Sequence, residues 1–310
     1  MIVTATLNPM LDKTVDVETL VRGRIQRAGR VEMVVGGKGV NVSRQLRRLG
    51  VETVATGLVG GHVGVLLRRL LTAEGIAHDF VEIASNTREG VTYREPDGTW
   101  TSVFEPPHTV TADEAEMFVA KCLTLLPGCR WLVCSGSSPC PAADGLYARV
   151  IRAAGERGVA AALDSYGDTF LQGLGARPAM IKINTDELRH MFGGSVTNDG
   201  DVLRALGTLS GRGARYVIIT DGPGPVFASE RSECWKLHPP RISAVNPTGS
   251  GDAMIAAVLA TLEQGEPFER ALVRGVAAGA ANARVWEVAN SKPGEIRSLE
   301  ALVRIEQLRT

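Results

Sequence analysis

Residues 246–264 read NPTGSGDAMIAAVLATLEQ, in which a polar loop with two glycines leads into a long apolar segment. The segment predicts a helix over Gly251–Gln264, and a second Ala-rich helix is predicted over Pro267–Arg284. Because both helices are apolar on most sides, we expect them to be buried.

The loop before the first of these helices predicts an anion site. Gly249 and Gly251 flank the small Ser250, so backbone N–H groups can turn toward one point, to which the helix adds its positive end. Such a hole can stabilise charge on a transferring phosphoryl group. Asp252 lies in the first helical turn, where its ionised form is favoured and can accept a proton from a substrate hydroxyl. Plain capping of the helix is the alternative interpretation.

Outward from this loop, strands and helices alternate along the chain. The predicted strands are Ile2–Leu7, Thr53–Val59, Arg130–Cys134, Val159–Leu163, Ala179–Ile183 and Tyr216–Thr220, followed by short strands at 226–228 and 233–237. The predicted helices are 40–49, His62–Glu74, Ala112–Leu125, Ala142–Arg157, Glu187–Met191 and Asp199–Leu209. Repeated strand–helix units favour an α/β fold with a doubly wound, mostly parallel sheet and helices on both faces.

Two stretches, about residues 13–35 and 87–107, interrupt this alternation with short β-like segments. The second predicts a hairpin of Val91–Arg94 and Thr99–Phe104 around a turn at 96–98. The simplest arrangement is one small shared β-sheet that projects over an edge of the main sheet as a lid. Since no flexible linker is visible, we expect residues 1–310 to form a single α/β domain.

The composition excludes several classes of protein. The chain has 310 residues, 44% of them hydrophobic and 22% charged, which rules out bulk disorder. Its 34 basic and 34 acidic residues cancel, so we expect no nucleic-acid partner and no membrane partner. No apolar run approaches the roughly 20 residues that span a bilayer, and the first residues are not typical of a signal peptide. Five cysteines without a CxxC pair argue against a disulfide framework, so a cytoplasmic location is expected.

A second glycine-containing loop, GGKGVN at 36–41, also precedes a predicted helix. Gly37 and its neighbours permit close approach of the backbone to a ligand, while Lys38 adds a point charge and Asn41 a polar amide. The loop is not a Walker A motif, because glycine rather than Ser or Thr follows the lysine. A flexible turn with a solvated lysine is the alternative.

Further polar residues follow the ends of predicted strands, where ligands bind in open α/β sheets. Asp12 could accept hydrogen bonds from sugar hydroxyls, although a turn aspartate is the alternative. Arg88 opens the second excursion and could reach a substrate phosphate, although a lone arginine more often lies on the surface. Ser137 lies in SGSSP (135–139), which contains no hydrolase nucleophile elbow.

The segment Asn184–Glu187, with Lys182 just upstream, predicts a place for Mg²⁺ held through waters and nucleotide phosphates. Capping of the following helix by the same residues is compatible with that role. Thr220 and Gly222 follow another strand, and either line a nucleotide or form a tight loop.

Taken in chain order, these stretches resemble the PfkB family of ribokinase-like carbohydrate kinases. The matching pieces are TLNP (6–9) with Asp12, GGKGVNVSRQLRRLG (36–50), TR (87–88), SGSSP (135–139), KIN (182–184) with Glu187, and TGSGD (248–252). The resemblance covers nearly the whole chain and implies a ribokinase-like fold with a β-lid. It also implies ATP-dependent phosphorylation of a ketohexose phosphate, of the fructose 1-phosphate or tagatose 6-phosphate type, to the bisphosphate.

The resemblance implies a role for each matching residue. Asp252 would be the general base, and Gly249, Ser250 and Gly251 would form the anion hole. Asp12, Gly37, Lys38 and Asn41 would hold the sugar, and Arg88 and Ser137 its phosphate. Lys182, Asn184 and Glu187 would serve ATP and Mg²⁺, with Glu187 as the metal ligand and Thr220 and Gly222 near the nucleotide. Pairing of the lid between subunits would make a homodimer.

Several positions depart from the family pattern. Ser250 replaces a usual Ala, Pro247 a usual Thr, Pro225 the final glycine of a loop near the nucleotide, and Gly90 a frequent Asn. A kinase of an unphosphorylated sugar or nucleoside, and a non-catalytic sugar-binding relative, therefore remain alternatives. A dinucleotide-dependent oxidoreductase is disfavoured, because Asn8-Pro9 stands where a glycine fingerprint would follow the first strand.

Overall fold

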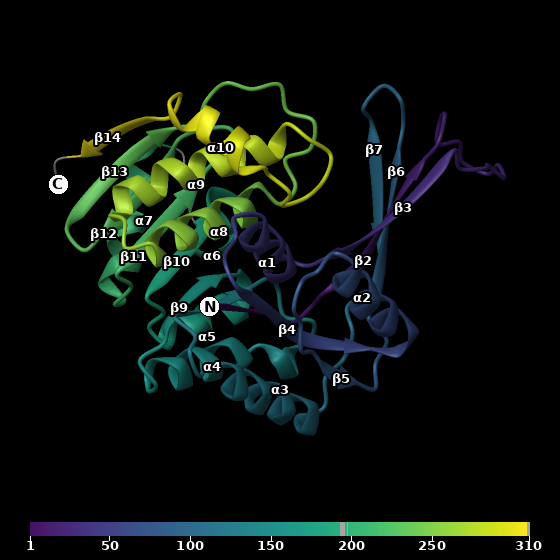
Figure 1. Cartoon of the computed structure of the whole chain (residues 1–310), viewed down its shortest axis with the longest axis horizontal. Coiled ribbons are helices and arrows are strands. Elements are labelled where there is room, and N and C mark those ends of the chain that lie inside the picture. Colours follow the sequence, from purple (N-terminus) through teal and green to yellow (C-terminus); the bar gives the residue numbers. More distant parts are fainter. Residues whose placement is uncertain (193–195, 197, 309–310) are drawn as a thin grey trace.

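The structure, a computed structural model, describes residues 1–192, 196 and 198–308. A ten-stranded sheet has the order β14-β13-β12-β11-β10-β9-β8-β1-β4-β5, and a separate four-stranded sheet has the order β3-β2-β6-β7 (Figure 1). Strands β11 to β5 of the large sheet pair in parallel, whereas β12, β13 and β14 are antiparallel at one edge. The predicted α/β class with a mostly parallel sheet and a small second sheet is confirmed.

Apart from β5 and β14, the strands of the large sheet follow the predicted sequence positions closely. They are β1 (Ile2–Thr6), β4 (Thr53–Gly60), β5 (Val81–Ile83), β8 (Trp131–Ser135), β9 (Ala160–Asp164), β10 (Met180–Asn184), β11 (Tyr216–Thr220), β12 (Val226–Glu230), β13 (Glu233–His238) and β14 (Arg304–Leu308). The helices are α1 (Lys38–Arg48), α2 (Gly61–Ala73), α3 (Ala112–Leu125), α4 (Leu146–Gly155), α5 (Gly167–Gly175), α6 (Thr185–Phe192), α7 (Asp199–Gly211), α8 (Ser250–Glu263), α9 (Phe268–Ala283) and α10 (Pro293–Glu300).

Helices cover both faces of the large sheet. One face packs against α3, α4, α5 and α7 through a core that includes Phe118, Tyr147 and Phe170. The other face packs against α1, α8 and α9, whose buried side chains include Leu46, Ile255 and Leu272 (Figure 1). Helix α8 is buried along most of its length, as its all-round apolar sequence predicts.

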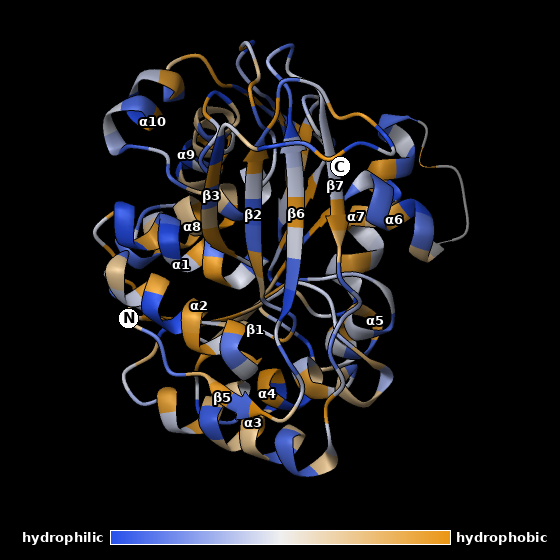
Figure 2. Cartoon of the chain, turned by 90° about the vertical axis from the view of Figure 1, so that its right-hand side faces the viewer, coloured by the Kyte–Doolittle hydropathy of each residue, from blue (hydrophilic) through white to orange (hydrophobic). Residues whose placement is uncertain are grey.

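The small sheet is the predicted lid, built from both excursions. Its strands are β2 (Met10–Asp16), β3 (Arg30–Gly36), β6 (Arg88–Arg94) and β7 (Trp100–Phe104), and Figure 2 looks onto the four side by side. The two excursions join where β2 and β6 pair in parallel, with Met10 opposite Arg88 and Asp12 opposite Gly90. Pairing between distant segments therefore brings Asp12 and Arg88 to neighbouring strands.

Several boundaries differ from the sequence predictions. The first excursion was predicted at about residues 13–35, but the lid begins earlier, at Met10, and its second strand starts only at Arg30. Ile25, between the two strands, is fully exposed in a loop. The predicted helix Ala142–Arg157 is interrupted after a 3₁₀ turn at Pro141–Ala143, and α4 begins at Leu146. Pro141 at the first position explains the tight initial turn.

Four elements were not predicted, namely β5, α5, α10 and β14. Helix α5 contains three glycines in nine residues, and β14 is a charged edge strand with little buried surface. Neither carries a clear apolar period, so their formation depends on the neighbours against which they pack.

Among the described residues, no helix is long and apolar enough to cross a membrane.

Candidate active site

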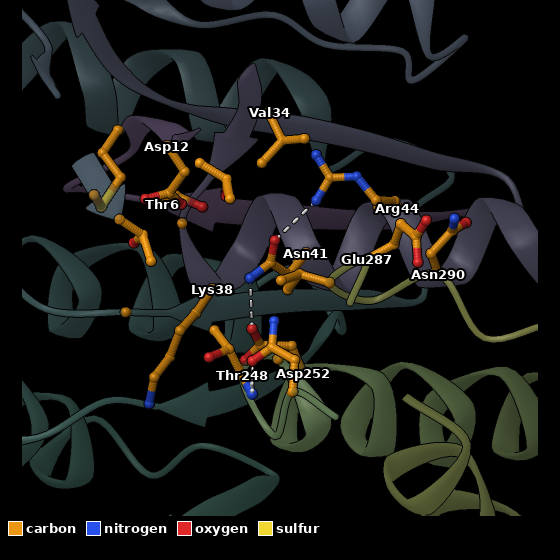
Figure 3. Close-up of a pocket in the computed structure, with 18 of the residues that line it drawn as sticks. Thr6, Asp12, Val34, Lys38, Asn41, Arg44, Thr248, Asp252, Glu287 and Asn290 are labelled. Carbon is orange, nitrogen blue, oxygen red and sulfur yellow. Dashed lines mark hydrogen bonds between the residues drawn. The ribbon is translucent and has the colours of Figure 1, made fainter. Parts of the chain in front are cut away.

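A cavity of about 840 Å³ lies between the lid and the carboxyl ends of the central strands. Its walls come from three places that are distant in sequence, namely the ends of β1 and β10, the lid, and the loop before α8. In Figure 3, Asp12 and Val34 of the lid lie above, and Thr248 and Asp252 lie below. Because parallel strands all end at one edge, the polar residues that follow them converge here. Eleven of the residues singled out from the sequence line it, namely Asp12, Gly37, Lys38, Asn41, Arg88, Ser137, Lys182, Asn184, Gly249, Gly251 and Asp252.

Asp252 stands in the first turn of α8 with only 5% of its surface exposed. The Asn41 side-chain amide donates a hydrogen bond of 2.8 Å to its Oδ2 (Figure 3). Burial and the nearby Asp164 carboxylate raise the pKa of Asp252 to about 6, although Lys38, Asn41 and Lys182 act in the opposite direction. A carboxyl group with this pKa is ionised at neutral pH and still basic enough to take a proton.

The loop before Asp252 has the backbone form that an anion hole requires. Gly249 is left-handed, with φ of 77°, and a side chain there would collide with Val288. A Cβ at Gly251 would come within 2.6 Å of Lys182 Nζ, so the absence of a side chain here leaves room for the lysine beside the helix terminus. The loop amides, the positive end of α8 and the Lys182 ammonium therefore gather positive potential at one point.

Asn282, which the sequence analysis missed, holds this loop in place from α9. Its amide donates to Thr248 O at 2.8 Å and Ser250 Oγ at 3.1 Å, and its Oδ1 accepts from Ala289 N at 2.6 Å. The side chain is completely buried, so all three bonds are formed without competition from water. A lone asparagine inside the alanine run of α9 was the available sequence signal.

Asp164 is a second missed residue, at the carboxyl end of β9. Its Oδ1 lies 3.2 Å from Lys38 Nζ and 3.4 Å from Lys182 Nζ, and the side chain is fully buried. Burial alone would raise the pKa of Asp164, but the two ammonium groups outweigh burial and lower it. Asp164 is therefore a fixed anion that orients both lysines.

Lys38 carries the charge of the GGKG loop to the cavity wall. Its ammonium group also lies 3.1 Å from Glu187 Oε1, and Figure 3 shows the side chain extending away from Asp12. Burial opposes its charge, but Asp164, Glu187 and Asp252 together raise the pKa of Lys38. The lysine thus connects the GGKG loop to the Asn184–Glu187 segment.

The lid side of the cavity carries Asp12 and Arg88. Burial raises the pKa of Asp12 to about 6, against the lowering effect of the Arg88 and Arg44 charges. The Arg88 Nε, Thr6 Oγ1 and Asn8 Oδ1 are buried without a hydrogen-bond partner in the described part of the chain. Such groups are costly to leave unpaired, so they are available to a polar ligand. Gly90, where the family often has Asn, is required by packing, because a Cβ there would overlap Met10 and Phe104.

The Asn184–Glu187 segment forms a reciprocal cap at the start of α6. Glu187 N donates to Asn184 Oδ1 at 2.8 Å, and Asn184 N donates to Glu187 Oε2 at 2.9 Å. The capping alternative is thus realised, and both Glu187 oxygens already have protein partners. In the described ranges no group of three or more His, Cys, Asp or Glu side chains forms a metal cage.

Four predicted site residues do not line the cavity, namely Glu187, Thr220, Gly222 and Ser250. Thr220 pairs with Asn184 across β10 and β11, one strand farther from Asp252. Gly222 is left-handed, with φ of 52°, which agrees with the tight-loop alternative.

The lidded α/β fold and the buried carboxylate at a helix N-terminus define a carbohydrate kinase of the ribokinase-like fold. The chain belongs to the pfkB family of carbohydrate kinases, whose sequence model matches residues 5–294. The family resemblance is therefore confirmed.

Relatives of established name agree with this assignment. The chain is 31% identical to a tagatose-6-phosphate kinase of Staphylococcus epidermidis over 91% of its length and 92% of the relative. It is 30% identical to a 1-phosphofructokinase of Bacillus subtilis, again over 91% and 92% of the two chains. Its structure is similar to Escherichia coli phosphofructokinase-2 in complex with potassium, with a TM-score of 0.91, 26% identity, and 97% and 98% of the chains covered.

Proposed function

We propose that this chain transfers the γ-phosphoryl group of ATP to a hydroxyl of a ketohexose phosphate, of the fructose 1-phosphate or tagatose 6-phosphate type, and forms the bisphosphate. The observation that carries the proposal is Asp252, a buried carboxylate that faces the cavity beside the backbone amides of 249–252. The names of the two curated relatives, both kinases of ketohexose phosphates, support this substrate class. In this proposal the chain acts as one α/β unit that closes its own lid over the cleft.

In the proposed reaction Asp252 takes the proton of the attacking hydroxyl. The hydroxyl oxygen forms a bond to the γ-phosphorus, the bond from that phosphorus to the bridging oxygen breaks, and ADP leaves with the electron pair. The amides of Gly249, Ser250 and Gly251 stabilise the charge that develops on the transferred group.

The residues near the proposed nucleotide side fit a metal–nucleotide complex. Mg²⁺, when bound, neutralises charge on the phosphate oxygens. Since both Glu187 oxygens accept bonds from protein groups, Glu187 would hold the ion through water, as Mg²⁺ prefers. Lys182, fixed by Asp164, would meet a phosphate oxygen at the helix terminus.

Arg88 supports a phosphate on the acceptor. Its Nε is buried and unpartnered among the described residues. Burial lowers the pKa of Arg88, and Asp12 on the adjacent strand opposes this effect only in part, so an anionic ligand would stabilise the charged guanidinium. An uncharged sugar or nucleoside would leave this buried donor without an anionic partner. Both proposed substrates are charged small molecules, which agrees with the expected cytoplasmic location.

We also propose a homodimer formed through the outer face of the lid. On that face Val15 pairs with Val31, and Val91 pairs with Val103, while Asp12 and the other cavity residues point to the inner face. Val31 and Val103 are 53% and 61% exposed, so a second copy would bury apolar surface there.

The function is tested by following ADP release over a panel of ketohexose phosphates, unphosphorylated sugars and nucleosides. We expect turnover with a ketohexose phosphate, and we expect Asp252→Asn to lower kcat by about 10²–10⁴-fold while nucleotide binding persists. Asp113→Asn, an exposed first-turn aspartate of α3, is the matched control and should change nothing.

Three outcomes would overturn parts of the proposal. A near-normal kcat in Asp252→Asn would show that Asp252 is not the general base. Turnover with unphosphorylated acceptors alone would show that the acceptor is not a sugar phosphate. No turnover with any acceptor, with binding retained, favours a non-catalytic sugar-binding protein.

A further inference from the structure

Asn41 is the one side chain in the described ranges that hydrogen-bonds the Asp252 carboxylate, and its own orientation is set from the other side. Its Oδ1 accepts from Arg44 Nη1 at 2.9 Å, while its Nδ2 donates to Asp252 Oδ2 at 2.8 Å (Figure 3). A guanidinium can only donate and a carboxylate can only accept, so these two neighbours fix which end of the amide faces the base.

Arg44 is itself held by groups from two other elements, β3 and α2. Its Nη2 donates to Val35 O on β3 at 2.8 Å and to Glu74 Oε1 at 3.0 Å, and its Nε donates to Glu74 Oε2 at 2.5 Å. Glu74 is the C-cap residue of α2, and the Arg44 side chain is only 10% exposed. A bidentate pair with so little exposure holds the guanidinium in one position.

From this chain of contacts we propose that Arg44 and Glu74 are positioning residues for the catalytic base, which act by holding the Asn41 amide with its NH₂ end toward Asp252. The proposal rests on the role of Asp252 given above. Neither residue touches the Asp252 carboxylate, so their effect on it passes through Asn41.

The physical consequence follows from the alternative amide orientation. Without Arg44, the amide can rotate and present its Oδ1 to Asp252, an arrangement compatible only with a protonated carboxyl group. The other charged groups facing Asp252 are Asp164, Lys38 and Lys182, and these stay in place when Arg44 is changed. Loss of the clamp should therefore make the base harder to ionise.

Arg44 also acts by charge on Asp12, so a simple charge effect must be separated from positioning. Glu74→Gln provides the separation, because it loosens the clamp and leaves the Arg44 charge in place. Arg47→Met is the matched control: Arg47 is an exposed neighbour on α1 that donates to Gly75 O at 2.8 Å beside the same cap, and no bond joins it to Asn41.

The experiment titrates Asp252 by NMR of ¹³C-carboxyl-labelled protein, with the signal assigned from its absence in Asp252→Asn. In Arg44→Met we expect the titration midpoint of Asp252 to rise by about one pH unit, and the acid limb of kcat to move with it. Glu74→Gln should shift the midpoint in the same direction by less, and Arg47→Met should leave it unchanged. In an Asn41→Ala background, Arg44→Met should add no further shift.

An unchanged midpoint in both Arg44→Met and Glu74→Gln would overturn the positioning role, as would an equal Arg44→Met shift with and without Asn41. If Arg44→Met does not fold, Glu74→Gln alone gives the same test. The NMR readout does not depend on turnover, so an active Asp252→Asn would refute the proposed function while the titration still decides the relay.

Discussion

The pKa values of two buried aspartates, Asp164 and Asp252, are shifted in opposite directions by their surroundings. Asp164 lies between two lysines, which lower its pKa, whereas burial and Asp164 itself raise the pKa of Asp252 to about 6. Separation of two carboxyl groups in this way is how a site assigns one fixed anion and one proton acceptor. The residues that shift these two pKa values are distant in sequence from the aspartates on which they act.

The raised pKa of Asp252 predicts that the base lowers the stability of the fold. A carboxyl group whose pKa is higher in the folded than in the unfolded state binds more protons when folded, so stability falls as pH rises from the ordinary aspartate pKa of 3.8 through about 6. Asp252→Asn removes this cost, and its Tm at about pH 8 should exceed the wild-type Tm by a few degrees. The gain should vanish below about pH 4, where both forms of the wild type are protonated.

Scanning calorimetry of Asp252→Asn and Asp113→Asn across that pH range measures this difference. Asp113→Asn, in an exposed first turn, should show no pH-dependent gain. A lower Tm for Asp252→Asn at neutral pH would mean that the Asn41 hydrogen bond and the attraction of Lys38 and Lys182 outweigh the cost of burying Asp252.

At the scale of elements, three features shape the loop before α8 and the first turn of this helix. Gly249, in the left-handed conformation, turns the chain. Asn282 of α9 holds the Thr248 carbonyl by a hydrogen bond, and the dipole of α8 adds positive potential at the helix N-terminus. The tight packing of Gly249 against Val288 means that the loop cannot relax without moving residues 284–290.

Gly249→Ala should therefore lower kcat by about 10²-fold, because the displaced amides no longer meet the developing charge. Gly265→Ala is a matched control, since Gly265 is also left-handed, with φ of 80°, but has open space where Gly249 meets Val288. Both variants should lose about 1–2 kcal/mol of stability from the strained backbone. Only Gly249→Ala should lose turnover, and equal kcat in the two variants would contradict the anion-hole role.

At the scale of the whole molecule, the lid contacts a segment from the C-terminal part of the chain, around Trp286. The Arg94 guanidinium lies 4.3 Å from the Trp286 ring centre and pairs with Asp16 at 2.8 Å, and Trp100 meets Trp286 edge-on at 6.3 Å. Asn246, at the start of the anion loop, donates to Trp286 O at 2.9 Å. The lid is thus in contact with the segment that supports the anion loop.

The proposed lid-to-lid dimer predicts a sedimentation result. Wild-type protein should sediment at twice the mass of the chain, and Val31→Lys with Val103→Lys should sediment as a monomer, because charges on both apolar strands oppose their burial. Leu302→Lys, an equally exposed residue outside the lid, is the control. A dimer that persists in the double variant would place the interface elsewhere.

The sequence by itself determined the alternation of strands and helices, the burial of α8 and the glycine loops at strand ends. These features are local, since apolar period and glycine position report on the immediate neighbourhood of each residue. For the same reason the order of motifs along the chain was enough to indicate the family and to single out Asp252 as the candidate base.

Only the tertiary structure decided which of these residues act together. Asn41 and Asp252 are 211 positions apart, and Lys38 and Asp164 are 126 apart, so no local pattern links them. The pairing of β2 with β6 placed Asp12 beside Arg88, and the fold moved Thr220 and Gly222 off the cavity wall. Charge states and amide orientations depend on burial and on long-range partners, which exist only once the sheet and its lid have assembled.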